Sequence, residues 1–261
     1  MNSKNNIHST AIVSEDCVIG KNVTIGPYAY VGPGIELDDN VEIKHHASIE
    51  KNTTIGKNST VFPFASLGTA PQDLKYRGEK TFLRIGENTT IREFCELNTA
   101  TGEGEETVIG NNCLLMGYVH VAHNCTVGDN VIMANLAQLA GHVTVYDNVI
   151  MGGHTGAHQF CRIGQFSMLG GGALAKRDVV PYALVDGDGK KIRTFNLIGL
   201  RRNGFTKEQI STIKDLYRIF FHSKRNTTQA ISYVKSEFDM EDELIADFIK
   251  FIEDSQRGII V

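Results

Sequence analysis

Four histidines and one glutamine carry the chemistry that this sequence most plainly offers. His120 and His123 stand three residues apart in "HVAHNCTVG", and His142, His158 and Gln159 follow within the next 36 positions. Histidine has an ordinary pKa close to neutral pH, so it suits a general base that activates a weak nucleophile, and it is also a common metal ligand. The residue types alone leave proton transfer, metal binding and solvated turns open.

A six-residue repeat determines how these side chains are held. From Ile7 to Ala175, 26 of the 29 positions at steps of six are apolar. The exceptions fall in two breaks of the repeat and are Asp73, Glu79 and Glu103. A period of six fits neither an α-helix nor an ordinary strand, but it is typical of a hexapeptide parallel β-helix.

We therefore expect a left-handed parallel β-helix over residues 1–185, with loops at about 69–82 and 99–107. Three hexapeptides form one triangular coil of about 18 residues, with the six-step residue pointing inward. Glycines that follow inward residues, such as Gly20 and Gly56, are expected where the chain turns sharply. The five cysteines all stand two places before an inward residue, which predicts small core side chains.

Residues 18 positions apart lie above one another in such a coil. The columns of interest are His123 with Gly141 and Gln159, Asn124 with His142 and Phe160, and Ala122 with Ala140 and His158. The histidines then converge at one corner, beside glycines that expose backbone N–H groups, as an acyl-transfer site requires. Zinc, held by the same histidines at about 2.0–2.1 Å, is the alternative.

Composition and the remaining sequence set the class of protein. The 261 residues carry a formal net charge of −4, which is too mild for a nucleic-acid binder. We expect no signal peptide and no membrane-spanning segment, and hence a cytoplasmic protein. Residues 186–261 show helical spacing of apolar residues, and Thr206 with Gln209 predicts a capping box, so we expect a small C-terminal helical domain.

Five motifs make the chain resemble the UDP-N-acetylglucosamine acyltransferases that begin lipid A synthesis. They are "HVAHNCTVG", "LAGHVTV", "GAHQFCRIG", "PQDLKYRGE" and "NLIGLRRNGF". The resemblance covers essentially the whole chain, and it implies a homotrimer with active sites between neighbouring β-helices. It also implies transfer of an (R)-3-hydroxyacyl group from acyl carrier protein to the 3-hydroxyl of UDP-N-acetylglucosamine. No cofactor is expected, because the thioester arrives activated.

The resemblance also implies roles for single residues. His123 would be the general base, and the backbone N–H of Gly141 would receive the oxyanion. The implied substrate contacts are Gln72, Asp73, Lys75, His120, Asn124, His142, His158, Gln159, Asn196 and Arg202. The loop at 69–82 is expected to reach a neighbouring active site.

Two further features concern the acyl donor. Asn135, Gly153 and Gly171 are 18 positions apart and form a column along the axis from the catalytic coil. By resemblance Gly171 limits acyl length, and a glycine there predicts a long donor. Because acyl carrier proteins are acidic, we expect a basic docking patch at Arg162, Lys176 and Arg177.

Three departures from the family pattern and several alternatives remain at this point. Asn124 stands where Asp commonly follows the catalytic histidine, Ile198 where Glu is frequent, and Asn203 where a second Arg is frequent. The alternatives are a binding β-helix without turnover, a zinc-dependent hexapeptide enzyme of the carbonic-anhydrase type, and a sister enzyme that N-acylates a glucosamine nucleotide. The sister usually carries an extra N-terminal domain. A 3-amino variant of the sugar also stays open.

Overall fold

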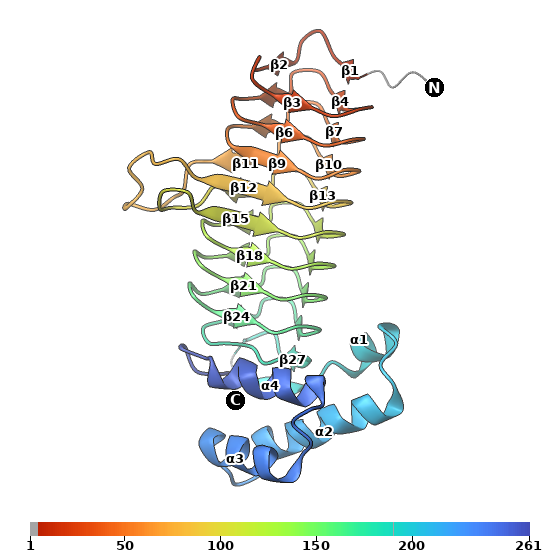
Figure 1. Ribbon diagram of the computed structural model, residues 1–261, viewed down its shortest axis with the longest axis vertical. Coiled ribbons are helices and arrows are strands. Elements are labelled where there is room, and N and C mark those ends of the chain that lie inside the picture. The colour runs from red at the N-terminus through yellow and green to blue at the C-terminus, as the bar shows by residue number, and fades with distance from the viewer. Residues whose placement is uncertain (1–4, 190) are drawn as a thin grey trace.

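Most of the chain winds into a three-sided parallel β-helix. The structure is a computed structural model that describes residues 5–189 and 191–261, and Figure 1 shows the coils stacked along one axis with helices at one end. Short strands of successive coils pair in parallel, and the three sheets contain eleven, nine and eight strands within the described residues. The register step is 18 residues, as from Thr126 to Thr144 and on to Arg162. The expected left-handed β-helix is confirmed.

The strands are mostly two residues long and follow one another from sheet to sheet. Sheet A contains β1 Asn6–Ile7, β4 Thr24–Ile25, β7 Glu42–Ile43, β10 Thr60–Val61, β13 Thr90–Ile91, β16 Leu114–Leu115, β19 Ile132–Met133, β22 Ile150–Met151, β25 Met168–Leu169, β27 Ala183–Val185 and β28 Ile192–Phe195. Sheet B contains β2 Ile12–Val13, β5 Tyr30–Val31, β8 Ser48–Ile49, β11 Ser66–Thr69, β14 Glu96–Asn98, β17 His120–Val121, β20 Gln138–Leu139, β23 Gly156–Ala157 and β26 Leu174–Ala175. Sheet C contains β3 Val18–Ile19, β6 Glu36–Leu37, β9 Thr53–Ile55, β12 Phe82–Ile85, β15 Glu106–Ile109, β18 Thr126–Val127, β21 Thr144–Val145 and β24 Arg162–Ile163.

The core of the prism is built from two positions in each hexapeptide. The six-step residue is buried, as at Val31, Ile43 and Val121, and so is the smaller residue two places before it. Four of the five cysteines are buried in that second position and Cys17 is half-buried, so they are core side chains as predicted. Burial raises the pKa of the Cys125 thiol to about 12, which keeps it protonated.

The corners of the prism use residues in the left-handed region, most of which are not glycine. Asn22, Asn40 and Asn58 have φ of 55° to 60°, and their side chains hydrogen-bond one another along the axis at 3.0–3.2 Å. Gly20 and Gly56 directly precede the turns at residues 21–22 and 57–58, as predicted, but neither has positive φ. A Cβ on Gly56 would lie 2.7 Å from the backbone of the next coil, so close stacking of coils explains the glycine.

Two loops leave the β-helix on the same side, as Figure 1 shows. Residues 70–81 connect β11 to β12, and residues 99–105 connect β14 to β15. The loops bind each other: the Gly102 N–H donates to the Glu79 carboxylate at 3.0 Å, and the Gly104 N–H donates to the Lys80 carbonyl at 2.9 Å. They therefore form one structural unit beside the prism.

Among the described residues, four helices follow the β-helix and lie at the end of its last coil, as Figure 1 shows. They are α1 Leu197–Arg202, α2 Lys207–Phe221, α3 Thr227–Glu237 and α4 Glu243–Glu253. The capping box of Thr206 and Gln209 is present at the start of α2, as predicted. Leu200, Tyr217 and Phe248 are buried against the end of the prism, and the Tyr217 hydroxyl donates to the Pro181 carbonyl at 2.7 Å.

The end of the β-helix differs in two respects from the prediction. Strand β28 lies beyond the expected boundary at residue 185 and pairs antiparallel with β27, so sheet A continues to Phe195. Helix α1 was not predicted, because its six residues are too few to show a clear period. In the described part of the chain, none of the helices combines the length and the apolar character that crossing a bilayer would require.

Candidate active site

The turn between β17 and β18 carries His123, whose ring packs directly on the next coil. A Cβ added to Gly141 would lie 2.5 Å from the imidazole Cε1 of His123, so only glycine leaves room for the ring. The His123 side chain is 14% exposed. No acceptor within residues 5–189 and 191–261 takes the backbone N–H of Gly141. The column of His123 and Gly141 thus places a largely buried imidazole beside a backbone N–H that has no acceptor among the described residues.

The two nitrogens of His123 face different partners. Nδ1 lies 2.9 Å from the side-chain oxygen of Asn124, whose amide also binds the loop residue Thr101. Nε2 faces the other loop and lies 3.8 Å from a carboxylate oxygen of Asp73. Asp73 therefore lies beside the His123 of its own chain. The expected reach of the 69–82 loop to a neighbouring active site stays a prediction.

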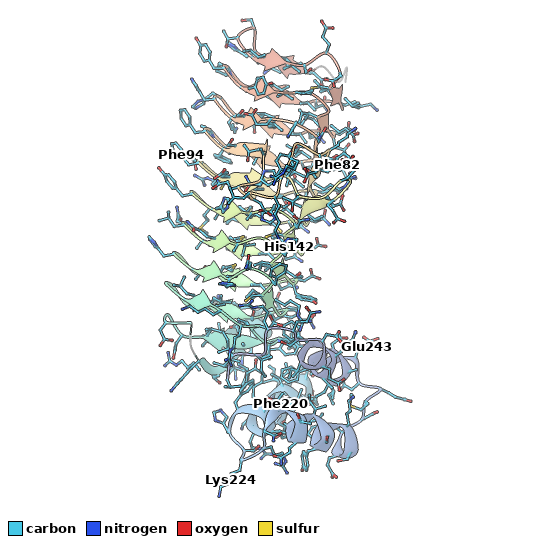
Figure 2. All side chains as sticks on the ribbon, turned by 90° about the vertical axis from the view of Figure 1, so that its left-hand side faces the viewer. Phe82, Phe94, His142, Phe220, Lys224 and Glu243 are labelled. Carbon is cyan, nitrogen blue, oxygen red and sulfur yellow. The ribbon has the colours of Figure 1, made fainter. Side chains whose placement is uncertain are left out.

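His142 completes this corner on the next coil. Its ring meets the His123 ring edge to face, with centroids 5.2 Å apart, and stacks on Phe160 at 4.7 Å. Burial lowers the pKa of His142 below its usual 6.5, and His123 adds to the shift. Figure 2 places His142 midway along the prism, between Phe82 and the helical end. A neutral His142 can hydrogen-bond a substrate without adding charge.

His120 lies on the neighbouring face, in β17, and has a partner that sequence reasoning missed. Its Nδ1 is 3.4 Å from a carboxylate oxygen of Glu96 in β14, close enough for charges to interact but not aligned for a hydrogen bond. Burial lowers the pKa of His120, and Glu96 opposes that shift. Glu96 also accepts a hydrogen bond from Gln72 at 2.9 Å. Glu96 and His120 are neighbours on successive coils but stand 24 positions apart, because the loop adds residues between them. Counting the regular 18 positions therefore does not find the pair.

An elongated groove of about 410 Å³ runs along the face of sheet B. Its lining residues include His120, Gln138, Gly156, His158, Leu174 and Lys176. His158 therefore joins His120 in this groove and is exposed, as is Gln159. The predicted cluster is thus split between a corner with His123 and His142 and a face with His120 and His158.

The column of Asn135, Gly153 and Gly171 is continuous but lies at another corner. A Cβ on Gly153 would lie 3.4 Å from the Asn135 carbonyl, and a Cβ on Gly171 would lie 3.5 Å from the Gly153 carbonyl. Asn135 precedes the sheet B strand of its coil, whereas His123 follows one. The column and His123 therefore border the same face from opposite edges, and the column does not start at the catalytic corner.

Asn196, a predicted substrate contact, and Arg162, a predicted docking residue, both bind groups of their own chain. The Asn196 side chain accepts from the Gly199 N–H at 3.1 Å and donates to the Phe166 carbonyl at 3.0 Å, so it caps α1. Arg162 is 19% exposed and forms an ion pair with the buried Asp178 at 3.0 Å. Each side chain therefore has a structural role where the prism meets the C-terminal helices.

Arg162 also holds the C-terminal helices on the prism. Its guanidinium donates to the Phe251 carbonyl at 2.6 Å and lies 4.3 Å from the centre of the Phe251 ring. Lys176 and Arg177 are not held in this way and line a second pocket with the C-terminal residues Ile260 and Val261. Arg202 is exposed at the end of α1. The predicted docking patch is therefore reduced to Lys176 and Arg177.

The zinc alternative receives no support from the donor set. Among the described residues, no three side chains of histidine, cysteine, aspartate or glutamate are grouped as metal ligands would be. His123 and His142 meet edge to face rather than directing two nitrogens at one point. The side chains that contact the two His123 nitrogens, Asn124 and Asp73, are instead suited to orienting a base.

Comparison with known proteins identifies the family. The model of domain 2 of UDP-N-acetylglucosamine O-acyltransferases matches residues 178–260, and the bacterial transferase hexapeptide model matches 16–51 and 106–141. An acyl-[acyl-carrier-protein]–UDP-N-acetylglucosamine O-acyltransferase of Aliarcobacter butzleri is 43% identical, with 98% of each chain covered. A match of 42% identity to the same-named protein of Gloeothece citriformis spans 67% of this chain and 64% of that protein.

Solved structures agree with this assignment over nearly the full length. The UDP-N-acetylglucosamine acyltransferase from Bacteroides fragilis has a TM-score of 0.93 at 38% identity and covers 97% of this chain and 99% of its own. The enzyme of the same family from Acinetobacter baumannii has a TM-score of 0.92 at 41% identity, with 98% and 99% covered. The chain belongs to the UDP-N-acetylglucosamine O-acyltransferase family.

Proposed function

We propose that this protein transfers an (R)-3-hydroxyacyl group from acyl carrier protein to the 3-hydroxyl of UDP-N-acetylglucosamine, the first step of lipid A synthesis. The observation that carries the proposal is the column of His123 and Gly141. One imidazole nitrogen lies beside Asn124 and the other faces the loop, and the adjacent Gly141 N–H has no acceptor among the described residues. That arrangement supplies a base and an oxyanion donor together.

The reaction follows from these two groups. Nε2 of His123 takes the proton of the sugar hydroxyl as its oxygen attacks the thioester carbonyl. The carbonyl electrons move to the oxygen, and the Gly141 N–H stabilises the oxyanion. When the intermediate collapses, the C–S bond breaks and the carrier thiolate takes the proton from the imidazolium. The products are the ester and the free carrier thiol, and no cofactor is needed because the thioester supplies the driving force.

The sugar nucleotide is assigned to the side chains around Nε2. Asp73 lies where a sugar hydroxyl would approach the base, and Lys75 is close enough to influence the pKa of His142. The Gln72 amide donates a hydrogen bond to the Glu96 carboxylate at 2.9 Å, and Glu96 lies beside His120. Further contacts are assigned to His142, His158, Gln159 and Arg202. The charge of Lys75 beside this corner suits a phosphate of the diphosphate.

We assign the active form to a homotrimer in the cytoplasm. The proposed acyl column ends at Gly171, on the opposite edge of sheet B from His123, so a single chain forms only one wall of a channel between them. A second copy packed along this face would supply the other wall. Size measurement by light scattering tests this: three chains per particle are expected, and an active monomer would contradict it.

Carrier docking is assigned to Lys176 and Arg177. Both line a pocket near the groove that holds His158, and their charge suits an acidic carrier. Charge reversal at both positions should raise the KM for the carrier thioester and reduce its salt dependence, because rim charges act mainly on association. An unchanged KM would locate docking elsewhere.

The function is tested by incubating the protein with acyl carrier protein thioesters of several lengths, with and without the 3-hydroxyl, and with several UDP-sugars. Mass spectrometry of the product then identifies both substrates. We expect a 3-hydroxyacyl ester of UDP-N-acetylglucosamine. An amide formed only with a 3-amino sugar would move the specificity to that variant, and no transfer at all would contradict the proposal.

A further inference from the structure

We infer that Glu96 positions His120 to accept a hydrogen bond from the 3-hydroxyl group of the acyl donor. Glu96 is then a positioning residue that acts through the imidazole and sets the preference for a hydroxylated donor. The inference rests on the proposed function and goes beyond it, because it names the two groups that distinguish a 3-hydroxyacyl chain from an unsubstituted one.

Glu96 directs its two carboxylate oxygens at different partners. One oxygen, Oε2, lies 3.4 Å from Nδ1 of His120, which stands opposite Glu96 on the next coil. The other, Oε1, accepts from the Gln72 amide at 2.9 Å and from the buried Asn98 amide at 3.4 Å. The carboxylate is therefore held from the loop and from the prism, with one oxygen facing His120.

The nitrogen of His120 that faces Glu96 must carry the proton when the ring is neutral. Nδ1 is buried and has no hydrogen-bond partner in the described part of the chain. An unprotonated Nδ1 would point its lone pair at a negative oxygen, whereas a protonated one points a positive N–H at it. The other nitrogen, Nε2, is then an acceptor. The His120 side chain is 24% exposed and lines the groove along sheet B, so a ligand in the groove can reach this acceptor.

The groove that His120 lines suits an acyl chain. Its lining is apolar apart from four residues and includes Leu139, Ala157 and Leu174. An alkyl chain is stabilised there because it leaves water. A hydroxyl on that chain would lose its water partners, which is costly unless the protein supplies a hydrogen bond. The Nε2 of His120 supplies an acceptor for it.

The place of His120 along the groove selects a hydroxyl close to the thioester. His120 belongs to the coil of His123, and Ala140, which lines the groove one coil further, is next to the proposed oxyanion donor Gly141. The third carbon of the donor is separated from the carbonyl carbon by a single carbon, so its hydroxyl stays beside this coil. Gln138, opposite His120 on the next coil, lies about 4.8 Å further along the axis.

Donor selectivity tests this role. It is the ratio of kcat/KM for an (R)-3-hydroxyacyl carrier thioester to kcat/KM for the unsubstituted thioester of the same length. We expect a wild-type ratio of about 10² or more, because a site that hydrogen-bonds a hydroxyl rejects the analogue that lacks it. Glu96→Met keeps the length of the side chain and removes the acceptor, so it should lower the ratio about 10-fold, the effect of one hydrogen bond.

Two further variants separate this role from a merely structural one. Glu106→Met is the matched control, because Glu106 is 43% exposed against 39% for Glu96 and lies on sheet C, paired with Arg84. It should keep the wild-type ratio. His120→Ala should lower the ratio at least as much as Glu96→Met, and the double variant should lower it no further, because both changes act on one hydrogen bond.

Several kinetic results would overturn the inference. An unchanged ratio in Glu96→Met would do so, and so would an equal loss of rate with both donors, which would indicate a structural role or a contact with the sugar. Additive effects of Glu96→Met and His120→Ala would show that Glu96 does not act through the imidazole.

The tautomer is measured directly by ¹⁵N NMR of the full-length protein labelled at histidine, with the His120 signals identified by their loss in His120→Ala. At a pH where the ring is neutral, Nδ1 should give the shift of a protonated nitrogen and Nε2 that of an unprotonated one. Adding the 3-hydroxyacyl thioester should move the Nε2 signal, and the unsubstituted thioester should not. The reverse tautomer, or equal shifts with both donors, would overturn the inference. Absence of transfer from every donor would instead contradict the proposed function, while these shifts still decide the role of Glu96 and His120.

Discussion

Two corners of one prism hold asparagines in the same backbone conformation and use them differently. Asn40 has φ of 60° and Asn124 has φ of 58°. Asn40 hydrogen-bonds Asn22 below it and Asn58 above it, so its amide joins coils. Asn124 instead bonds His123 beside it and Thr101 from a loop. The same turn thus serves stacking at one corner and the orientation of a base at the other.

The loop insertion accounts for this difference. At the Asn40 corner each coil follows the last without interruption, and an asparagine meets the same residue type one coil away. At the catalytic corner residues 99–105 interrupt the repeat and bring Thr101 to the Asn124 amide. A regular repeat tends to satisfy its polar groups internally, so an active site arises where the regularity is broken.

The largest effect expected at the catalytic corner is that of His123→Ala. Removing a general base should lower kcat by about 10²–10⁴-fold, with the fold intact because the ring lies outside the prism core. Steady-state kinetics and circular dichroism measure the two properties. His8→Ala, on an exposed residue of the first coil, is the matched control and should keep wild-type kcat. Near-normal turnover of folded His123→Ala would contradict the assignment of His123 as the general base.

Gly141→Ala perturbs the same corner through packing. The new Cβ would lie 2.5 Å from the His123 ring, so the imidazole must move. A misplacement of about 1 Å can cost about 10²-fold in rate, and we expect a kcat loss of that order with little change in the KM for either substrate. Kinetics that match the wild type would show that the ring does not depend on this contact.

Gly171→Met tests the third corner of the same coils. A Cβ there meets only the Gly153 carbonyl, at 3.5 Å, so the longer side chain fits the fold and projects into the proposed acyl path. At about 0.8 kcal/mol for each buried methylene, excluding three or four of them should shift preference by about 2–3 kcal/mol toward a donor about four carbons shorter. Gly171→Ala should give a smaller shift. Identical ranking of donor lengths in all three proteins would place the acyl chain elsewhere.

The smallest expected effect is a loss of folding stability at low pH. Burial lowers the pKa of both His120 and His142 below the usual 6.5, so the unfolded chain binds more protons than the folded one just below that pH. Stability is therefore fully present above about pH 6.5 and declines as pH falls toward the lowered folded values. Urea unfolding at pH 8 and pH 5.5 should show this decline, and His120→Gln should reduce it. A decline of equal size in the variant would contradict the role of His120.

The sequence predicted the scaffold well because a strict period of six leaves few alternatives. It placed the column of His123 and Gly141 correctly by counting 18 positions. It missed the pairing of Glu96 with His120, because the insertion changes the count to 24. Any such count fails wherever a loop adds residues between two coils.

Counting the repeat also could not predict the contacts between the β-helix and the C-terminal helices. Arg162 was assigned to docking, whereas its guanidinium binds Asp178 and the Phe251 carbonyl, 89 positions away. Asn196 was assigned to the nucleotide, whereas it caps a short helix on the last coil. How helices pack on a repeat depends on tertiary contacts that no periodicity records.

The comparison of the two corners is tested most directly by measuring kcat for Asn40→Ala and Asn124→Ala side by side. Both place alanine at a φ near 60°, at a similar backbone cost of about 1–2 kcal/mol, so the difference between them reports the side chains alone. We predict wild-type kcat for Asn40→Ala and a loss of about 10- to 100-fold for Asn124→Ala, with similar losses in stability. Equal kcat values for the two variants would contradict the account.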